Sequence, residues 1–279
     1  MQYATSLSGV KIPKIIYGTA WKKERTTELV VKAIETGFRG IDTACQPKHY
    51  SEERVGKALL ILQNQGFKRE DLYIQTKFTP LGGQDPNNIP YDKNAPLSAQ
   101  VIQSFEVSKL NLQTSYIDSL VLHSPIFPHS ELLKAWRAME EIQKSGEILQ
   151  LGVSNCYDLQ TLKRLYTDAQ IKPAVVQNRF YSDSAYDMEL RQWCDEHNII
   201  YQSFWSLTAN PHILSSELVI NLAQKYNKTQ AQIFFAFLMH IGIVPLTGTT
   251  SPLHMGEDLD TLNITLEDVE FEDINRLLY

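Results

Sequence analysis

Four polar residues stand where a parallel barrel would carry its chemistry. Asp42, Lys77 and His123 lie at or near the ends of apolar, strand-type runs, and Tyr50 stands in the loop after Asp42. Barrel enzymes keep their catalytic residues at the carboxyl ends of strands and in the loops that follow. Taken singly, each residue has an ordinary explanation, such as a solvated strand-end charge or a hydrogen-bonded core histidine. The combination is what points to a site.

The chemistry that these side chains predict is proton transfer. An unpaired charge at an inward, otherwise apolar strand position is costly, so we expect Asp42 to neutralise Lys77. A buried Lys cation beside a phenol favours the phenolate, and we expect it to lower the pKa of Tyr50 into a usable range. A histidine nearby can orient a carbonyl oxygen or relay a proton. The set therefore predicts acid–base catalysis around Tyr50.

The elements that would position these residues alternate strictly between strand and helix. The strand candidates are 14–20, 38–44, 72–78, 119–124, 149–154, 174–180, 199–205 and 242–248, and the helix candidates are 24–35, 51–65, 98–112, 131–145, 158–169, 187–197 and 230–241. Near-continuous apolar strands are typical of sheets buried on both faces. We predict a single-domain α/β fold over residues 1–279, a (β/α)8 TIM barrel. An open doubly wound sheet is disfavoured because the first turn, 18–23, has no G-x-G-x-x-G phosphate loop.

One segment, 79–97, breaks this alternation. It is rich in Gly, Pro and Asn, too long for an ordinary connection and too interrupted for a helix. Because it follows the third strand, we expect it to overhang the barrel mouth as a lid or pocket wall. A passive surface insertion is the alternative.

Composition limits the partners. The net charge of −6 argues against a nucleic-acid surface, and no apolar run reaches the roughly 18 residues that span a bilayer. Residues 1–5 show no signal-peptide pattern, and the three widely spaced cysteines are expected to be free thiols in a reducing compartment. We expect a cytoplasmic monomer with a small-molecule substrate and neither a nucleic-acid nor a membrane partner.

The motifs resemble those of the aldo-keto reductases over nearly the whole chain. They are G-F-R-G-I-D-T-A followed by Y-x-E-E-x-V-G-K-A-L, then I-Q-T-K, L-V-L-H-S-P, G-E-I-L-Q-L-G-V-S-N and V-V-Q-N. The resemblance implies a nicotinamide cofactor extended across the barrel mouth and hydride transfer to a carbonyl. It also implies that Tyr50 is the general acid and that Asp42, Lys77 and His123 complete the catalytic tetrad.

The resemblance further implies which residues surround the cofactor and substrate. Ser154, Asn155 and Gln177 match the residues that hold the carboxamide, and Phe204 matches a ring stacked on the nicotinamide. The implied cofactor-binding set is Gly18, Thr19, Ala20, Asp42, Ser154, Asn155, Gln177, Phe204, Ser206, Leu207, Thr247, Thr249, Thr250, His254, Glu257 and Asp258. Trp21, Tyr50, His123 and Phe127 are the expected substrate contacts, and no metal is expected.

The loop after Asp42 is longer than the family spacing. Counting forward from Asp42 reaches Pro47, and counting back from Val55 reaches His49. Neither is the expected acid, so we assign the role to Tyr50 and keep His49 as the alternative.

The residues expected to bind the 2′-phosphate of NADPH and to form the walls of the substrate pocket also depart from the family pattern. Leu246 takes the position of a family Lys, and His254 that of an Arg. We expect NADPH, bound less tightly than usual, with NADH possible. The sequence given ends at Tyr279, soon after a helix-type segment, so the resemblance implies an open pocket with broad carbonyl acceptance.

The leading hypothesis is NADPH-dependent reduction of aldehydes or ketones to alcohols. The alternative is a non-catalytic nicotinamide-binding barrel that senses redox state, since one fold can serve several functions. A metal-dependent barrel hydrolase lacks support, because no cluster of His and carboxylates is evident beyond Asp42 and His123. The sequence names neither the physiological carbonyl nor the direction of the reaction.

Overall fold

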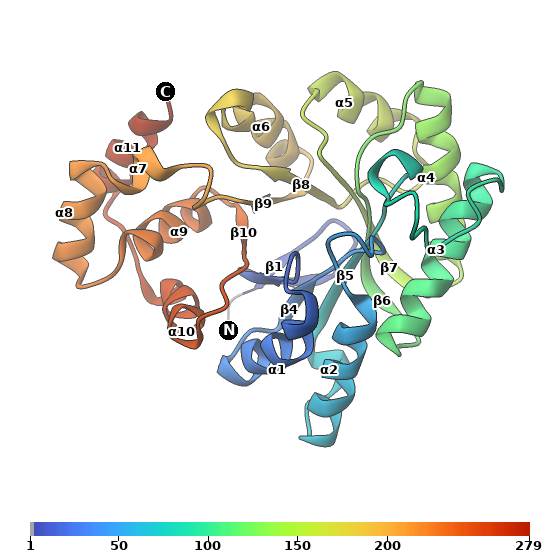
Figure 1. Cartoon of the computed structure of the whole chain (residues 1–279). Helices are drawn as coiled ribbons and strands as arrows, with labels where there is room; N and C mark the ends of the chain where they lie inside the picture. The colour runs from blue at the N-terminus through green and yellow to red at the C-terminus, as the bar shows by residue number, and fades with distance from the viewer. Residues whose placement is uncertain (1–2) are drawn as a thin grey trace.

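The apolar runs form the parallel strands of a closed barrel, as the computed structural model shows (Figure 1). The strands are β3 (Ile16–Gly18), β4 (Gly40–Asp42), β5 (Tyr73–Phe78), β6 (Ile117–Leu122), β7 (Ile148–Ser154), β8 (Val175–Arg179), β9 (Ile200–Phe204) and β10 (Val244–Thr247). They follow one another around the barrel in chain order, and β10 pairs with β3 to close it. The predicted TIM barrel is confirmed. The structure describes residues 3–279. The first two residues of the expected 1–279 domain therefore lie outside it, and so does the start of the segment that was inspected for a signal peptide.

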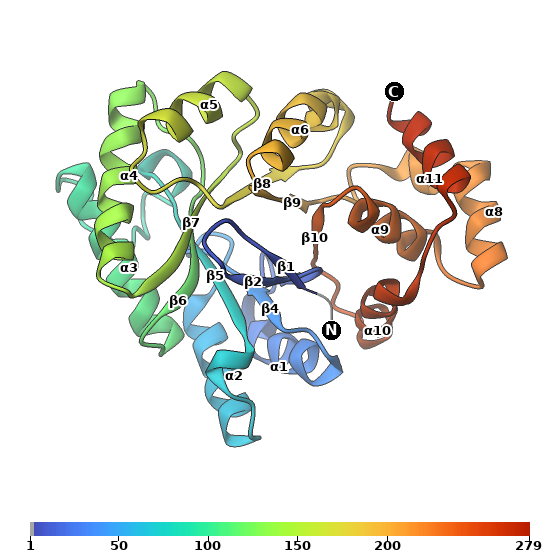
Figure 2. The same cartoon turned by 180° about the vertical axis from the view of Figure 1, so that it is seen from behind.

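Helices surround the barrel and cover the outer faces of its strands (Figures 1 and 2). They are α1 (Thr26–Thr36), α2 (Glu52–Asn64), α3 (Leu97–Leu112), α4 (His129–Lys144), α5 (Leu159–Asp168), α6 (Met188–Glu196), α7 (Pro211–Leu214), α8 (Glu217–Tyr226), α9 (Gln230–His240), α10 (Pro252–Asp260) and α11 (Asp268–Asn275). Short 3-10 turns stand at η1 (Lys23–Arg25), η2 (Arg69–Asp71), η3 (Leu81–Gly83), η4 (Ser182–Asp187), η5 (Thr261–Asn263) and η6 (Arg276–Leu278). The sequence predicted α1 to α6 and α9, but not α7, α8 and α10. In the described residues no helix is long and apolar enough to cross a membrane.

A hairpin that the sequence did not predict lies across the amino-terminal end of the barrel (Figure 2). Its antiparallel strands are β1 (Tyr3–Thr5) and β2 (Lys11–Pro13). Ile12 of this hairpin is fully buried and packs with Ile16, Tyr73, Val175 and Val244. The hairpin therefore closes this end of the barrel with apolar side chains.

Toward the opposite end the barrel interior becomes polar. Inward positions of β5, β7, β8 and β9 carry glutamines, namely Gln75, Gln150, Gln177 and Gln202, all buried. Tyr73 links this layer to the apolar one, since its hydroxyl donates to Gln75 Oε1 at 2.7 Å and accepts from Gln150 Nε2 at 3.2 Å. The glutamines satisfy one another in place of water. Above them lie the charged residues of the site.

Candidate active site

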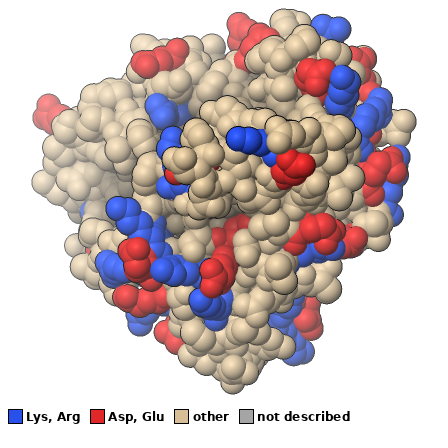
Figure 3. Space-filling model, turned by 45° about the vertical axis from the view of Figure 1, so that its right-hand side comes forward, with Lys and Arg blue, Asp and Glu red and all other residues tan. Residues whose placement is uncertain are grey.

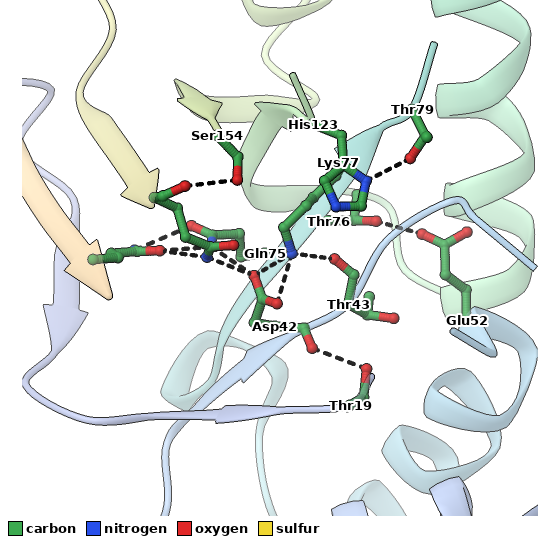
Figure 4. A network of polar contacts seen from close by, with 12 residues as sticks. Thr19, Asp42, Thr43, Glu52, Gln75, Thr76, Lys77, Thr79, His123 and Ser154 are labelled. Atoms are coloured by element: carbon green, nitrogen blue, oxygen red, sulfur yellow. Dashed lines mark hydrogen bonds and ion pairs between the residues drawn. The ribbon is translucent and has the colours of Figure 1, made fainter. Parts of the chain in front are cut away.

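Lys77 and Asp42 form a buried ion pair at the carboxyl ends of β5 and β4 (Figure 4). Lys77 is 1% exposed, and its Nζ donates to both Asp42 carboxylate oxygens at 2.6 Å and to the Thr43 carbonyl at 2.9 Å. Three acceptors match the three hydrogens of an ammonium group. Burial lowers the pKa of Lys77, and the Asp42 carboxylate opposes that shift. The predicted neutralisation of Lys77 by Asp42 is confirmed.

Glutamines fix the other side of the Asp42 carboxylate. Gln75 and Gln177 donate from Nε2 to Asp42 Oδ1 at 2.7 Å and 3.0 Å. The same two amides donate to Gln202 Oε1 at 2.8 Å and 2.9 Å. The Asp42 carboxylate is therefore held by partners from two strands, β5 and β8, and Gln177, an expected cofactor contact, is oriented by the ion pair itself.

His123 follows β6 and is neutral. Burial, and after it the charge of Lys77, lowers the pKa of His123 to about 3. Its Nδ1 lies 2.6 Å from Thr79 Oγ1, and its carbonyl accepts from Asn155 Nδ2 at 2.8 Å. Thr79, which follows β5, thus holds the ring, and Asn155, which follows β7, holds the backbone of His123.

Tyr50 lies over this ion pair. Its ring centre is 5.3 Å from Lys77 Nζ and 6.0 Å from the centre of the His123 ring. Burial, and after it the Asp42 charge, raises the pKa of Tyr50. The expectation that Lys77 lowers this pKa is therefore wrong. Asp42 neutralises Lys77 at contact distance, so little of the cation's field reaches the phenol and desolvation dominates.

His49, the alternative acid, lies beside Tyr50 at the same mouth. The amides of both residues donate to the Gln46 carbonyl, at 3.1 Å and 3.0 Å, which folds the long loop into a turn. The His49 ring lies against Trp21 with centres 3.9 Å apart and planes inclined by 36°, and its Nδ1 lies 3.0 Å from Gln46 Oε1. Pro47 is exposed. The structure brings both candidates to the site, and the choice of Tyr50 stays a prediction.

One cavity of about 870 Å³ joins these groups to most of the expected cofactor contacts. The sequence-predicted residues that line it are Gly18, Ala20, Trp21, Asp42, Tyr50, His123, Ser154, Asn155, Gln177, Phe204, Ser206, Leu207, Thr247, Thr249, His254, Glu257 and Asp258. Lys77, the remaining predicted catalytic residue, does not line it, and neither do three predicted contacts. Thr19 is buried with its hydroxyl donating to the Asp42 carbonyl at 2.9 Å, Thr250 is exposed, and Phe127 is 73% exposed.

The expected carboxamide contacts are fixed by short hydrogen bonds. Ser154 Oγ donates to the Gln177 carbonyl at 2.6 Å, and Asn155 is held in the left-handed region at φ 52°. The cavity also contains Arg179 and Trp205, which sequence reasoning missed. The period of two along β8 was the available signal, because it places Arg179 on the same side as Gln177.

The end of the cavity around β10 and α10 is where the resemblance places the phosphate and adenine. Thr247 Oγ1 donates to Asp258 Oδ2 at 2.6 Å, and burial raises the pKa of Asp258 to about 6. Lys22 reaches across to donate to the Gly248 carbonyl. On the face in Figure 3, acidic and basic side chains are interspersed.

The segment 79–97 lies beside this cavity and lines a neighbouring one. That second cavity, about 650 Å³, is lined by Asn88, Ile89 and Pro90 from the segment and shares Trp21, His49 and Tyr50 with the first. Within the segment, Gln84 Nε2 donates to the Cys45 carbonyl at 2.9 Å. The segment therefore packs on the Tyr50 loop, and its role as a lid stays a prediction.

The geometry defines a barrel in which a phenol and a neutral imidazole line one cavity with the Asp of a buried Lys–Asp pair. The chain matches the Aldo/keto reductase family over residues 14–217. It is 30% identical to methylglyoxal reductase DkgA of Escherichia coli K12 over 91% of this chain and 85% of that one, and 30% identical to glyoxal reductase of Bacillus subtilis over 97% and 90%.

Solved structures of other proteins have a similar fold. An aldo/keto reductase from Brucella melitensis superimposes with a TM-score of 0.83 at 25% identity, covering 99% of both chains. A Bombyx mori aldo-keto reductase in complex with NADP superimposes with a TM-score of 0.82 at 24% identity, covering 99% of this chain and 92% of that one. This protein belongs to the aldo/keto reductase family and is an oxidoreductase.

Proposed function

We propose that this protein reduces aldehydes or ketones to alcohols with NADPH, and that Tyr50 is the general acid. The observation that carries the proposal is the buried Lys77–Asp42 pair, whose Asp42 lines one cavity with Tyr50, His123 and Phe204. Two relatives are named as reductases of methylglyoxal and glyoxal, which supports a small, reactive carbonyl as the substrate.

The donor set fits a nicotinamide cofactor. Ser154, Asn155 and Gln177 place hydroxyl and amide groups near the Phe204 ring, and the same cavity extends to Thr247 and Asp258. Its volume, about 870 Å³, is in the range of cofactor sites. When bound, the reduced nicotinamide supplies the hydride.

Tyr50 supplies the proton. Its raised pKa keeps the phenol protonated at neutral pH, which is the state a general acid needs for reduction. Lys77 Nζ lies 5.3 Å from the ring centre, and its pairing with Asp42 leaves the phenol protonated rather than ionised. Oxidation would require the phenolate in the resting enzyme, so the raised pKa favours the direction of reduction.

His123 orients the carbonyl. When Thr79 donates its hydroxyl hydrogen to Nδ1, the neutral ring carries its hydrogen on Nε2. That group can donate to a carbonyl oxygen without competing for the proton of Tyr50, because the pKa of His123 lies near 3.

Turnover of 4-nitrobenzaldehyde, followed by loss of NADPH absorbance, tests this assignment in the wild type, Tyr50→Phe and His49→Gln. We expect the kcat of Tyr50→Phe to fall by about 10²–10⁴-fold, the usual contribution of a general acid, with NADPH binding retained. His49→Gln, altered at the neighbouring position, serves as the matched control and should keep most of its activity.

The other outcomes separate the remaining hypotheses. Activity that survives in Tyr50→Phe and collapses in His49→Gln would move the acid to His49. A wild type that binds NADPH but turns over no carbonyl would favour the non-catalytic, redox-sensing barrel.

Among the described residues no group of three or more His, Cys, Asp or Glu side chains is placed to hold a metal ion.

A further inference from the structure

Arg179 ends β8 and lines the main cavity, yet it has no part in the proton transfer described above. It stands two residues beyond Gln177, so the alternation of the strand points both side chains inward. Its register partner on β9 is Phe204. Arg179 therefore lies at the nicotinamide end of the cavity, one strand from the expected stacking ring.

The guanidinium is held by aromatic rings alone. It lies 4.5 Å from the centre of the Trp205 ring and 5.2 Å from that of Tyr181. Its Nε is buried without a hydrogen-bond partner, and within residues 3–279 no carboxylate forms an ion pair with it. Stacking orients the planar fork while leaving its donors unused.

The backbone beneath this stack is strained. Trp205 adopts φ 56°, in the left-handed region that bulky residues rarely occupy, and its side chain is 51% exposed. The strained backbone and the exposed indole thus occur where the Arg179 guanidinium stacks on Trp205. Such strain at a cavity mouth is typical of functional sites.

Three other charged residues that line the cavity already have partners. Asp42 is paired with Lys77, Asp258 accepts from Thr247, and Lys22 donates to the Gly248 carbonyl. The chain as a whole carries a net charge of −6, so an anion would approach this cavity only through a local cation. An Arg fork with unused donors is suited to bind an oxyanion in bidentate fashion.

Two sources could supply that oxyanion: a carboxylate on the substrate, or a phosphate of the cofactor. The position of Arg179 favours the substrate. It is paired in register with Phe204, the ring expected to stack on the nicotinamide, whereas Leu246 and His254, at the expected phosphate-binding positions, belong to β10 and α10. We propose that Arg179 binds the carboxylate of an anionic aldehyde or ketone and so determines substrate specificity. This inference rests on the proposed reductase function.

The test compares 4-carboxybenzaldehyde with its neutral methyl ester in the NADPH-loaded enzyme. For Arg179→Gln we expect kcat/KM for the carboxylate to fall by about 10- to 100-fold, as for loss of a charge-assisted contact, while kcat/KM for the ester is unchanged. Arg179→Lys should be intermediate, since it keeps the charge without the fork. Arg164→Gln, which removes an exposed cation on α5, is the matched control and should behave as the wild type.

Two binding measurements identify the source of the anion. Calorimetry with 4-(hydroxymethyl)benzoate and the enzyme–NADP⁺ complex should show binding by the wild type and its loss in Arg179→Gln. NADPH titration by fluorescence should give equal Kd values for both proteins. A raised NADPH Kd in Arg179→Gln would assign Arg179 to the cofactor phosphates and overturn the inference.

The remaining outcomes are also decisive. An equal loss for carboxylate and ester would make Arg179 a purely structural residue, and a wild type that prefers the ester would refute the specificity. If the wild type binds NADPH but reduces neither compound, the proposed function fails. Calorimetry with the carboxylate still decides the role of Arg179 in that case.

Discussion

At the level of single residues, the ion pair between Lys77 and Asp42 combines a stability cost with a chemical purpose. Removing two charges from water costs free energy, and their mutual attraction offsets this cost only when every remaining polar atom has a partner. Here the Thr43 carbonyl, Gln75 and Gln177 supply those partners. The pair is thus well satisfied, and each member depends on the other.

Lys77→Met should separate stability from catalysis. It leaves the Asp42 carboxylate buried without its cation, so we expect the free energy of unfolding to fall by about 3–5 kcal/mol. The double variant Asp42→Asn/Lys77→Met lacks both charges of the pair and should recover most of that stability while remaining inactive. Urea unfolding and NADPH-dependent turnover measure the two properties.

The exposed pair of Lys57 and Glu53 on α2 offers the control. Lys57→Met should change the free energy of unfolding by less than about 1 kcal/mol, as is usual for surface pairs. A Lys77→Met protein as stable as the wild type, or a double variant no more stable than the single one, would contradict the conclusion that Lys77 and Asp42 depend on each other.

At the level of elements, the close contact between α2 and α3 places the loop that carries Tyr50. Gly56 of α2 lies against the α3 backbone, and a Cβ atom there would come within 2.0 Å of the Asn111 carbonyl oxygen. Only glycine allows this approach. The start of α2 follows Tyr50 directly, so a shift of this helix would move the proposed acid.

Gly56→Ala should therefore destabilise the protein by about 1–3 kcal/mol, the typical cost of overpacking, and lower kcat. Gly256, inside α10, is the matched control, because a Cβ there meets nothing within 4 Å. Gly256→Ala should raise the free energy of unfolding by about 0.5–1 kcal/mol through helix propensity. Denaturant midpoints compare the two, and equal effects would refute the packing argument.

The elements that sequence reasoning missed share a physical reason. The strands of the hairpin have three residues each, and α7 has four, so none is long enough to show a period. The segment that forms α8 lies between β9 and β10, where α7, α8 and α9 replace a single helix, and α10 and α11 both follow β10. Tertiary packing, rather than local pattern, therefore defines the hairpin and α7.

At the level of the whole molecule, one cavity connects the proton-transfer residues to β10 and α10, so cofactor preference depends on residues far from the chemistry. Leu246 lines the cavity at the position where the family resemblance places a lysine. An apolar side chain there offers no charge-assisted bond to the 2′-phosphate, which is the group that distinguishes NADPH from NADH.

Leu246→Lys should restore that contact. We expect NADPH binding to tighten by about tenfold or more, since a hydrogen bond to a charged group contributes about 1.5–3 kcal/mol, while NADH binding stays constant. Fluorescence titration with both cofactors measures this. Leu253→Lys is the control, because Leu253 is 68% exposed on α10 and does not line the cavity. Wild-type binding that already favours NADPH by several orders of magnitude would refute the prediction.

The sequence by itself determined the barrel and the residues that gather at its mouth. Strict β-α alternation gives a parallel sheet, and parallel strands bring their carboxyl ends together. For that reason the pairing of Asp42 with Lys77, and the presence of Tyr50 and His123 in one cavity, could be anticipated, whereas Gln177 was indicated only by the family resemblance. These are consequences of order along the chain.

Only the tertiary structure decided what each side chain meets after closure. Asp42 and Gln177 are 135 residues apart and become hydrogen-bonded partners, and Arg179 meets Trp205 across neighbouring strands. The pKa of Tyr50 depends on how completely the Lys77 charge is cancelled and the phenol desolvated. Distances, burial and partners set electrostatic energies, and a linear pattern of residue types specifies none of these.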